Sequence, residues 1–305
     1  MRPITYKIWD IIRKNGAALG VTLLTLTLTR DPTDAGERAK PQRIISLNVC
    51  TDQLLLIMGL RQRLVSVTFL AADPSSSSIP EAARGLLLNR GRAEEILPLR
   101  PDLVLAGNTA ATPTVQLLRR LGHRVVVVPL ATTLDDIPRN IKILARATGE
   151  GARGRKMIEH FKKELEIISA EAQLDQGSPP PSAMIFGPNG ITSGDHSLSE
   201  AIITAAGFTN GMTTHGLKGV GRVPLETVLA FRPRLLILNS LKVNNPSLAV
   251  NLLAHPALKH SFSSRTTIHV NHHVWACGSP LVLNAIRRLA QIRARLVKIR
   301  RMVRP

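Results

Sequence analysis

Three histidines grouped near the end of the sequence are the first candidates for a chemical role. The stretch "HVNHH" places His269, His272 and His273 close together. On a strand, His269 and His273 would share one face and His272 would point to the other, so a metal ion would need further ligands from elsewhere in the chain. We therefore expect polar residues at a strand end, with no metal site and no resident cofactor.

Cys50 is the second candidate, because Asp52 is close in sequence and a thiolate can act as a nucleophile. No particular histidine can be assigned as its base. The sequence contains no G-x-S-x-G, Walker A or H-E-x-x-H signature, and the glycines of "GEGARG" do not follow a strand as in a phosphate fingerprint. We expect no enzymatic activity, with an exported thiol-dependent α/β enzyme as the competing class. Cys50 and Cys277 are an even pair that an oxidising compartment could join.

Two glutamates open a phrase that the chain contains twice. "EEILPLRPDLVLAG" begins at Glu94 and "ETVLAFRPRLLILN" begins at Glu226. Each copy predicts a short helix that stops before a proline, followed by an apolar strand. An acid in the first turn of a helix gains about 0.3–1 kcal/mol from the helix dipole. That effect explains one glutamate adequately, but it explains two equivalent ones less well.

The elements that must position these residues alternate between short apolar runs and longer amphipathic ones. In the first half we expect strands at 43–48, 64–69, 102–107 and 124–129, and helices at 51–60, 93–100 and 112–122. Thr51 or Asp52 would cap the first helix, and the valines of 124–129 suit a central parallel strand. In the second half we expect strands at 183–188, 234–240 and 267–272, and helices at 197–207 and 224–232.

This alternation predicts an α/β fold with parallel sheets and right-handed crossovers. Residues 135–173 contain no strand-like run and predict one or two helices. We therefore expect two parallel-sheet α/β lobes joined by a long backbone helix, with a ligand cleft between the lobes at the carboxyl ends of the strands. The expected parts are an export signal and flexible N-terminus (1–42), an N-terminal lobe (43–134), a linking helix region (135–176) and a C-terminal lobe (177–305).

Charge and hydropathy at the two ends of the chain indicate where the protein is located, and the charge pattern argues against nucleic acid as its partner. Residues 1–16 are basic and the next thirteen, "AALGVTLLTLTLT", are uncharged. This pattern predicts an export signal and a periplasmic protein, with an uncleaved membrane anchor as the alternative. The net charge is +19, yet no aromatic residues are interleaved with the basic ones, so nucleic acid is not expected. Residues 284–305 predict a basic terminal helix with one apolar face, and weak binding to anionic lipid is its alternative role.

Five phrases together resemble one protein family. "RIISLNVCTDQLLL", "NRGRAEEILPLRPDLVLAG", "LLRRLGHRVVVVPL", "GRVPLETVLAFRPRLLIL" and "WACGSP" are similar to periplasmic substrate-binding proteins of ABC importers for iron-siderophores, haem and cobalamin. The resemblance runs from about Arg43 to about Ala290. It implies two lobes bridged by one long helix (class III), small closure on the ligand, and a monomer that meets a dimeric permease. It also implies that Glu94 and Glu226, one per lobe, dock into arginine pockets on the two permease subunits.

The resemblance further implies which residues line the cleft. The first wall would carry Asn48, Cys50, Thr51, Phe69, Asn89, Arg90 and Asn108, and the second Asn189, Arg222, Asn239 and Trp275. Phe69 and Trp275 would stack on the ligand, while Arg90 and Arg222 could pair with an anionic chelate. Cys50 and Cys277 fall in loops that could face each other near the cleft, and whether they pair stays open. The expected ligand is an iron chelate, either a siderophore or haem, with cobalamin as the alternative.

Overall fold

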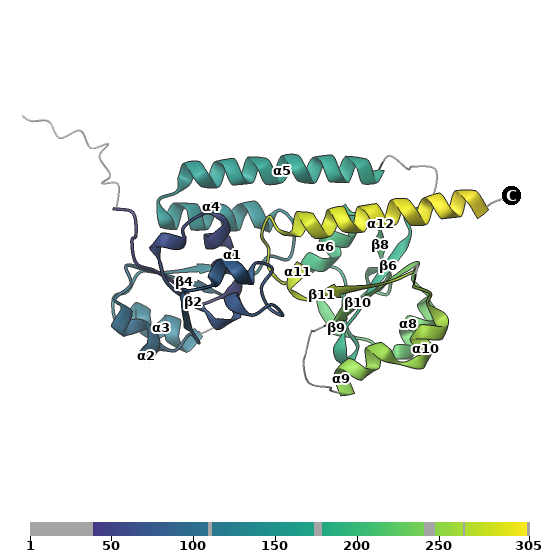
Figure 1. Ribbon diagram of the computed structural model, residues 1–305, viewed down its shortest axis with the longest axis horizontal. Helices are drawn as coiled ribbons and strands as arrows, with labels where there is room; N and C mark the ends of the chain where they lie inside the picture. The colour runs from purple at the N-terminus through teal and green to yellow at the C-terminus, as the bar shows by residue number, and fades with distance from the viewer. Residues whose placement is uncertain (1–38, 109–111, 174–178, 241–247, 265, 304–305) are drawn as a thin grey trace, which may run out of the picture. The chain divides into compact units, whose positions relative to one another are not determined.

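Two parallel sheets organise the chain, and each takes its strands from one half of the sequence (Figure 1). The computed structural model describes residues 39–108, 112–173, 179–240, 248–264 and 266–303. Lys40–Pro305 form one compact unit. The predicted export signal lies almost wholly outside the described residues.

The first sheet has five strands in the order β3-β2-β1-β4-β5, and all its pairings are parallel. The strands are β1 (Ile44–Ser46), β2 (Leu64–Thr68), β3 (Leu87–Asn89), β4 (Leu103–Gly107) and β5 (Val125–Val128). The helices are α1 (Val49–Ile57), α2 (Ala93–Ile96) and α3 (Thr112–Arg120), and a 3-10 turn (Leu97–Leu99) extends α2.

Three sequence expectations for this lobe need correction. The cap of α1 is Asn48, one turn earlier than expected, because its side chain accepts the Cys50 N–H. The valines of β5 lie at the sheet edge, where three of the four are half-buried, and not at the centre. The edge strand β3 was not predicted, because Leu87 and Leu88 are exposed and give no alternation.

The second sheet has four parallel strands in the order β11-β10-β6-β8. They are β6 (Ser182–Phe186), β8 (Thr209–Asn210), β10 (Leu235–Ser240) and β11 (Thr267–Asn271). A separate antiparallel pair, β7 (Ile191–Ser193) with β9 (Val220–Arg222), was not predicted because both strands are very short. The helices are α6 (Leu198–Ala205), α7 (Gly211–Thr214), α8 (Leu225–Phe231), α9 (Leu248–Asn251), α10 (Pro256–Ser261), α11 (His273–Ala276) and α12 (Val282–Val303).

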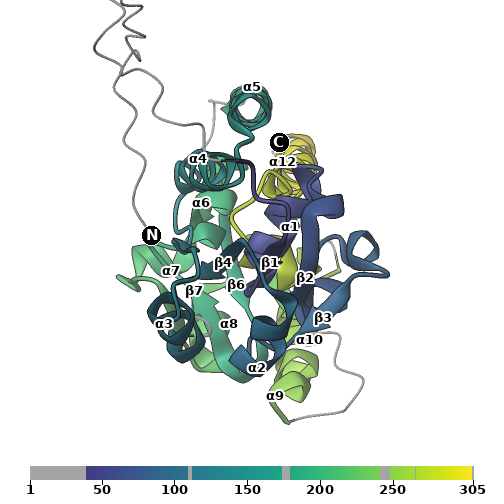
Figure 2. The same cartoon turned by 90° about the vertical axis from the view of Figure 1, so that its left-hand side faces the viewer.

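A layer of three helices runs along one side of both sheets (Figures 1 and 2). It consists of α4 (Asp136–Thr148), α5 (Gly151–Gln173) and α12. Gly149 ends α4 at a φ of 71°, a conformation that glycine adopts without strain. The ion pair between Arg287 of α12 and Glu164 joins α12 to α5. The predicted fold class, two parallel-sheet lobes with a long linking helix, is confirmed.

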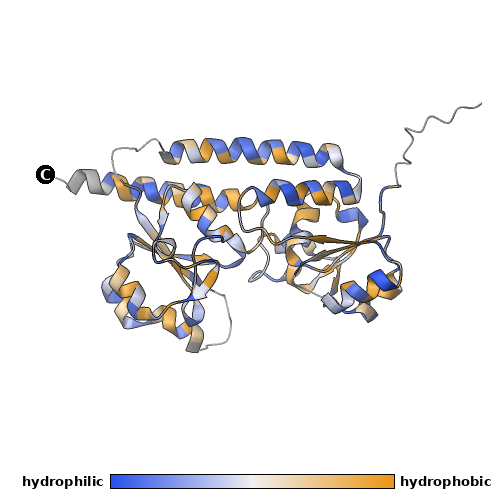
Figure 3. Cartoon of the chain, turned by 180° about the vertical axis from the view of Figure 1, so that it is seen from behind, coloured by the Kyte–Doolittle hydropathy of each residue, from blue (hydrophilic) through white to orange (hydrophobic). Residues whose placement is uncertain are grey.

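The apolar core consists of three clusters arranged around the sheets. Along β4, Leu103 and Leu105 belong to the cluster beneath the helical layer, while Val104 and Ala106 face α2 and α3. This alternation follows from the two-residue period of a strand. The cluster beneath the helical layer includes residues of both sheets, such as Ile44 and Ile237, so one continuous core underlies α4, α5 and α12. In Figure 3 the strands of both sheets are accordingly coloured hydrophobic.

The repeated phrase is a repeated structural unit. In each copy a short helix leads into a strand, α2 into β4 and α8 into β10. The helices end on Arg100 (φ 44°, ψ 61°) and Arg232 (φ 49°, ψ 63°), both in the left-handed region. A buried proline follows each arginine, and this pairing reverses the chain sharply from helix to strand. The predicted helix–strand pairs are therefore confirmed, and both copies use the same backbone geometry.

Candidate functional site

The register of the first sheet brings Phe69 and Arg90 together at its carboxyl edge. Thr68, the last residue of β2, pairs with Asn89, the last residue of β3. Phe69 and Arg90 are the next residues of each strand. The Arg90 guanidinium lies 4.9 Å from the centroid of the Phe69 ring, within cation–π range. The ring is 41% exposed, so it offers an apolar surface beside a positive charge.

The next strands along the sheet contribute Asn48 and Asn108. The Asn48 side chain packs over Gly107: a Cβ added there would lie 2.7 Å from Asn48 Nδ2, so this close approach requires glycine. A small cavity of about 30 Å³ is lined by Asn48, Cys50, Thr51 and Asn108. It is too small for anything but water, so a larger ligand would bind over this edge rather than inside it.

Two predicted site residues of this lobe have partners within the protein. Asn89 is buried, and its Nδ2 donates to the Ser46 carbonyl at 3.1 Å and to Ser66 Oγ at 2.8 Å. Thr51 is buried as well, and its hydroxyl donates to the Asn48 carbonyl at 2.8 Å. Both side chains therefore hold the shape of the carboxyl edge.

The second lobe places Asn189, Arg222 and Asn239 at the corresponding edge of its sheet. Asn189 follows β6, in a turn with a φ of 55°. Arg222 is exposed and pairs through its backbone with Ile191. Asn239 is buried, with its Nδ2 3.4 Å from His272 Nδ1. Burial, and then the charge of His273, hold the pKa of His272 below its usual value. The sequence analysis assigned no role to His272, although it singled out the motif "HVNHH" that contains this residue.

Trp275 lies in the core rather than on a wall of the cleft. Its ring is 5% exposed and belongs to the cluster beneath the helical layer. The short helix α11 turns the side chain inward, whereas a residue in an open loop would expose it. This leaves Phe69 as the exposed aromatic ring among the predicted site residues.

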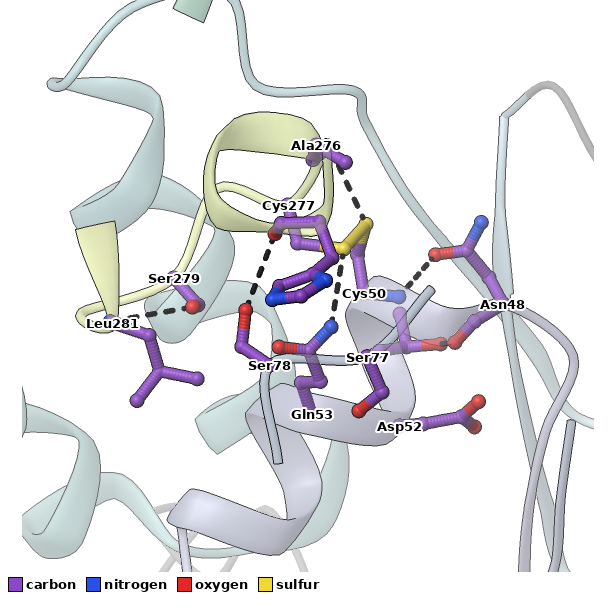
Figure 4. The surroundings of a disulfide bond; sticks show 12 residues. Asn48, Cys50, Asp52, Gln53, Ser77, Ser78, Ala276, Cys277, Ser279 and Leu281 are labelled. Carbon is purple, nitrogen blue, oxygen red and sulfur yellow. Dashed lines mark hydrogen bonds between the residues drawn. A yellow bond between two sulfur atoms is a disulfide. The ribbon is translucent and has the colours of Figure 1, made fainter. Parts of the chain in front are cut away.

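A disulfide joins the two lobes beside the first wall (Figure 4). Cys50, in the first turn of α1, is bonded to Cys277 at the end of α11. Gln53 Nε2 lies 3.5 Å from Cys277 Sγ, and Ser78 Oγ donates to the His273 carbonyl at 3.2 Å. A bonded cysteine offers no free thiol, so Cys50 in this state cannot act as the nucleophile of the competing enzyme hypothesis.

Asp52 is a buried ionisable residue of α1, two positions after Cys50 of the disulfide. The residue has no exposed surface, and its Oδ2 accepts hydrogen bonds from both the N–H and the hydroxyl of Thr68. Its Oδ1 has no partner among the described residues. Burial raises the pKa of the Asp52 carboxyl from 3.8 to about 7, against the opposing effects of the Ser46 hydroxyl and of Thr68. No sequence signal marks this shift, because it depends on tertiary burial.

The two glutamates are exposed and available for a partner. Glu94 in the first turn of α2 and Glu226 in the first turn of α8 make no ion pair or hydrogen bond with the described residues. Neighbouring Glu95 differs, because its Oε2 accepts the Arg90 N–H at 2.6 Å. Both helices cover the sheet faces turned away from the helical layer, with Ile96 and Val228 in the two outer clusters.

Comparison with known proteins assigns this chain to a family. The model of the family described as periplasmic binding protein matches residues 44–264, well over half of the chain. The chain belongs to the periplasmic binding protein family. This confirms the resemblance carried by the five sequence phrases.

This periplasmic binding protein has curated relatives of modest identity. It is 28% identical to the cobalamin-binding protein of Halobacterium salinarum over 172 residues, 56% of this chain and 46% of that protein. It is 30% identical to the vitamin B12-binding protein of Vibrio cholerae over 144 residues, 45% of this chain and 50% of that protein. The chain thus spans about half the length of the curated relatives it matches.

Solved structures share the fold over most of the chain. The periplasmic haem-binding protein RhuT from Roseiflexus sp. RS-1, in apo form, superposes with a TM-score of 0.70 at 22% identity, covering 84% of this chain and 98% of that one. The periplasmic vitamin B12-binding protein BtuF of Vibrio cholerae gives a TM-score of 0.64 at 20% identity, covering 85% and 99%. At these identities the likeness shows the fold.

The described residues bear on two other kinds of site, a membrane span and a metal centre. None of their helices combines the length and the apolar character needed to cross a bilayer. They also contain no group of three or more metal-ligating side chains placed to hold an ion. The three histidines of "HVNHH" lie in the described part of the chain.

We predict that Asp52→Asn flattens the pH dependence of stability. Because the pKa of Asp52 is higher in the folded than in the unfolded chain, the folded state keeps a proton that the unfolded state releases. Stability is therefore lost as pH rises from about 4 to about 7. Between about pH 5 and pH 8 the wild type should lose on the order of 2 kcal/mol that the variant keeps, measured by urea unfolding. Asp135→Asn, an exposed control, should behave like the wild type; a parallel decline in Asp52→Asn would contradict the prediction.

We predict that removing the disulfide lowers stability. Cys50→Ser with Cys277→Ser should reduce the free energy of unfolding by about 2–5 kcal/mol, because the bond constrains the unfolded chain over a separation of 227 residues. Urea unfolding without reductant measures this loss, and reduced wild type should resemble the double variant. Detection of two free thiols in the unfolded, unreduced wild type would show that the bond is absent.

Proposed function

We propose that this protein captures a metal chelate at the carboxyl edges of its two sheets and delivers it to the permease of an ABC importer. The observation that carries the proposal is the gathering of polar side chains and one exposed ring at these edges, from both lobes, in a chain of the periplasmic binding protein family. Open parallel sheets bind ligands at such edges. The names of its relatives, which bind cobalamin or haem, support the same ligand class.

Two kinds of chelate have specific support. The amides of Asn48, Asn108 and Asn189 suit cobalamin, whose corrin ring carries amide side chains that both donate and accept hydrogen bonds. The Phe69 ring with Arg90 above it suits an anionic chelate, such as haem, which is flat and carries propionates, or a ferric catecholate siderophore. Since these two curated relatives are named for cobalamin, cobalamin has as much support as the iron chelates.

We predict that Arg90→Gln separates these ligands. An anionic chelate should bind about tenfold more weakly to the variant, because a charge-assisted contact contributes more than about 1.4 kcal/mol. Cobalamin, with uncharged amides at its rim, should bind within about twofold of the wild type. Calorimetric titration with haemin, ferric hydroxamate, ferric catecholate and cyanocobalamin provides the measurement.

Arg92→Gln is the matched control, because Arg92 is an exposed neighbour with the same charge. It should leave every affinity unchanged. The proposed function would be rejected if none of the four ligands binds the wild type. Equal losses in both variants would reject only the role of Arg90.

We also propose that Glu94 and Glu226 contact the two halves of the permease. A permease dimer with two-fold symmetry can meet two equivalent anchors, one per lobe. Exposed carboxylates that make no ion pair or hydrogen bond with the described residues can pair with arginine without first breaking an internal contact there. The binding protein would act as a monomer, and residues 1–42 would direct its export.

We predict that Glu94→Ala with Glu226→Ala abolishes transport and spares ligand binding. Chelate affinity should stay within about twofold, while permease-dependent uptake should fall at least about tenfold, because charged contacts set docking orientation. The measurement is uptake into vesicles that contain the cognate permease. Glu166→Ala with Glu171→Ala removes the same charge from exposed positions of α5 and should transport normally. Normal uptake by the Glu94 and Glu226 variant would refute the docking role.

A further inference from the structure

The helical layer of this protein has a strongly basic surface. In the described parts of α4, α5 and α12, twelve lysines and arginines are exposed against three glutamates. We call this surface the basic face. Sequence analysis recognised only its last part, the terminal helix. The full surface depends on packing, because α12 comes from a stretch of the chain far from α4 and α5 and yet packs beside α5 (Figures 1 and 2).

A groove between α4 and α5 gives the basic face its shape. It has a volume of about 710 Å³ and a floor that includes Ala145, Gly154 and Ile158. The helices approach closely at Gly154, where an added Cβ would lie 2.4 Å from that of Ala145, so glycine permits the groove. Cationic side chains rise from both helices along its walls: Arg139, Lys142, Arg146, Arg155 and Lys162.

Most of these charges are unbalanced. Arg139 pairs with Asp136 at 2.7 Å. Lys142, Arg146, Arg155 and Lys162 make no ion pair or hydrogen bond with the described residues. Among the described residues that line the groove, Glu159 is the one acid. Long cationic side chains over an apolar floor can lie along that floor and hold their charges outward. Such a surface is complementary to an extended negative one.

We propose that the basic face binds the surface of a bilayer that contains anionic phospholipids. The charges are spread over three long helices, and α5 alone extends about 35 Å, so the surface is broad enough for many headgroups at once. Each lysine or arginine near an anionic bilayer adds to the attraction. Nucleic acid fits less well, because Phe161, the aromatic residue of these helices in their described parts, is buried and offers no stacking surface.

Binding through the basic face and docking on a permease in the same bilayer exclude each other. Glu94 and Glu226 lie on helices that cover the opposite faces of the sheets. A molecule held on a bilayer by α4 and α5 therefore presents its carboxylates away from that bilayer. This inference is independent of the chelate and does not rest on the proposed function.

The test compares two variants of the full chain with equal net charge. In the face variant, Lys142, Arg146, Arg155 and Lys162 are each changed to Gln. In the control variant, Arg119, Arg120, Lys218 and Lys259, which are exposed on other elements, are changed in the same way. Glutamine keeps helix propensity close to that of lysine and arginine, and equal melting temperatures would show that both variants fold.

The readout is the affinity for phosphatidylcholine vesicles with phosphatidylglycerol, divided by the affinity for phosphatidylcholine alone, at about 0.15 M salt. This ratio cancels any apolar insertion by the N-terminal segment, which all variants share. We expect the ratio to fall at least about tenfold in the face variant and less than about threefold in the control. Equal falls in both variants, or no preference for anionic vesicles in the wild type, would overturn the proposal. So would displacement from vesicles by duplex DNA at equal phosphate concentration.

Discussion

Parallel pairing within each sheet is the constraint on which the rest of the structure depends. Because the strands of a sheet all run the same way, every strand ends at one edge, and the next residue of each chain segment falls there. The pairing of Thr68 with Asn89 thus decides that Phe69 meets Arg90. A shift of one residue would turn these side chains to the opposite face. The same rule places the first turns of α2 and α8 on the edge side, because each helix runs back against its following strand.

Two interactions hold the two sheets together. One is the continuous apolar cluster beneath α4, α5 and α12, which includes Ile44 of the first sheet and Ile237 of the second. The other is the bond from Cys50 to Cys277, which ties α1 to α11 close to the carboxyl edges. Helices resist bending more than loops do, and a covalent bond across the seam adds a second restraint. Together they favour a site whose two walls keep nearly the same separation with and without ligand, which reduces the ordering cost of binding.

Local patterns in the sequence were enough for the fold and for part of the site. The repeated phrase predicted two helix–strand units because proline and an apolar run act over a few residues, and both units end on a left-handed arginine. The short strands β3, β7 and β9 left no such pattern. Side-chain roles were less predictable than backbone. By position in the sequence Asn89, Thr51 and Trp275 were expected to line the cleft, yet all three are buried, and their burial depends on neighbours distant in sequence. The raised pKa of Asp52 is invisible to sequence for the same reason.

The arrangement of charge follows from the same architecture. An α/β sheet has two faces, and here one face of each sheet packs beneath the helical layer while the other packs against α2 and α3 or α8 and α10. On the first side twelve exposed cations stand against three exposed glutamates, whereas the second side carries the carboxylates Glu94 and Glu226 among fewer cations. Positive charge is therefore unevenly distributed over the molecule, and a charged surface orients a molecule whose charge is unevenly distributed. An orientation that turns the basic face toward a negative bilayer turns the carboxylates toward the aqueous side. The proposed lipid contact and the proposed permease contact therefore use opposite sides of one fold, so one molecule would not make both on the same bilayer at once.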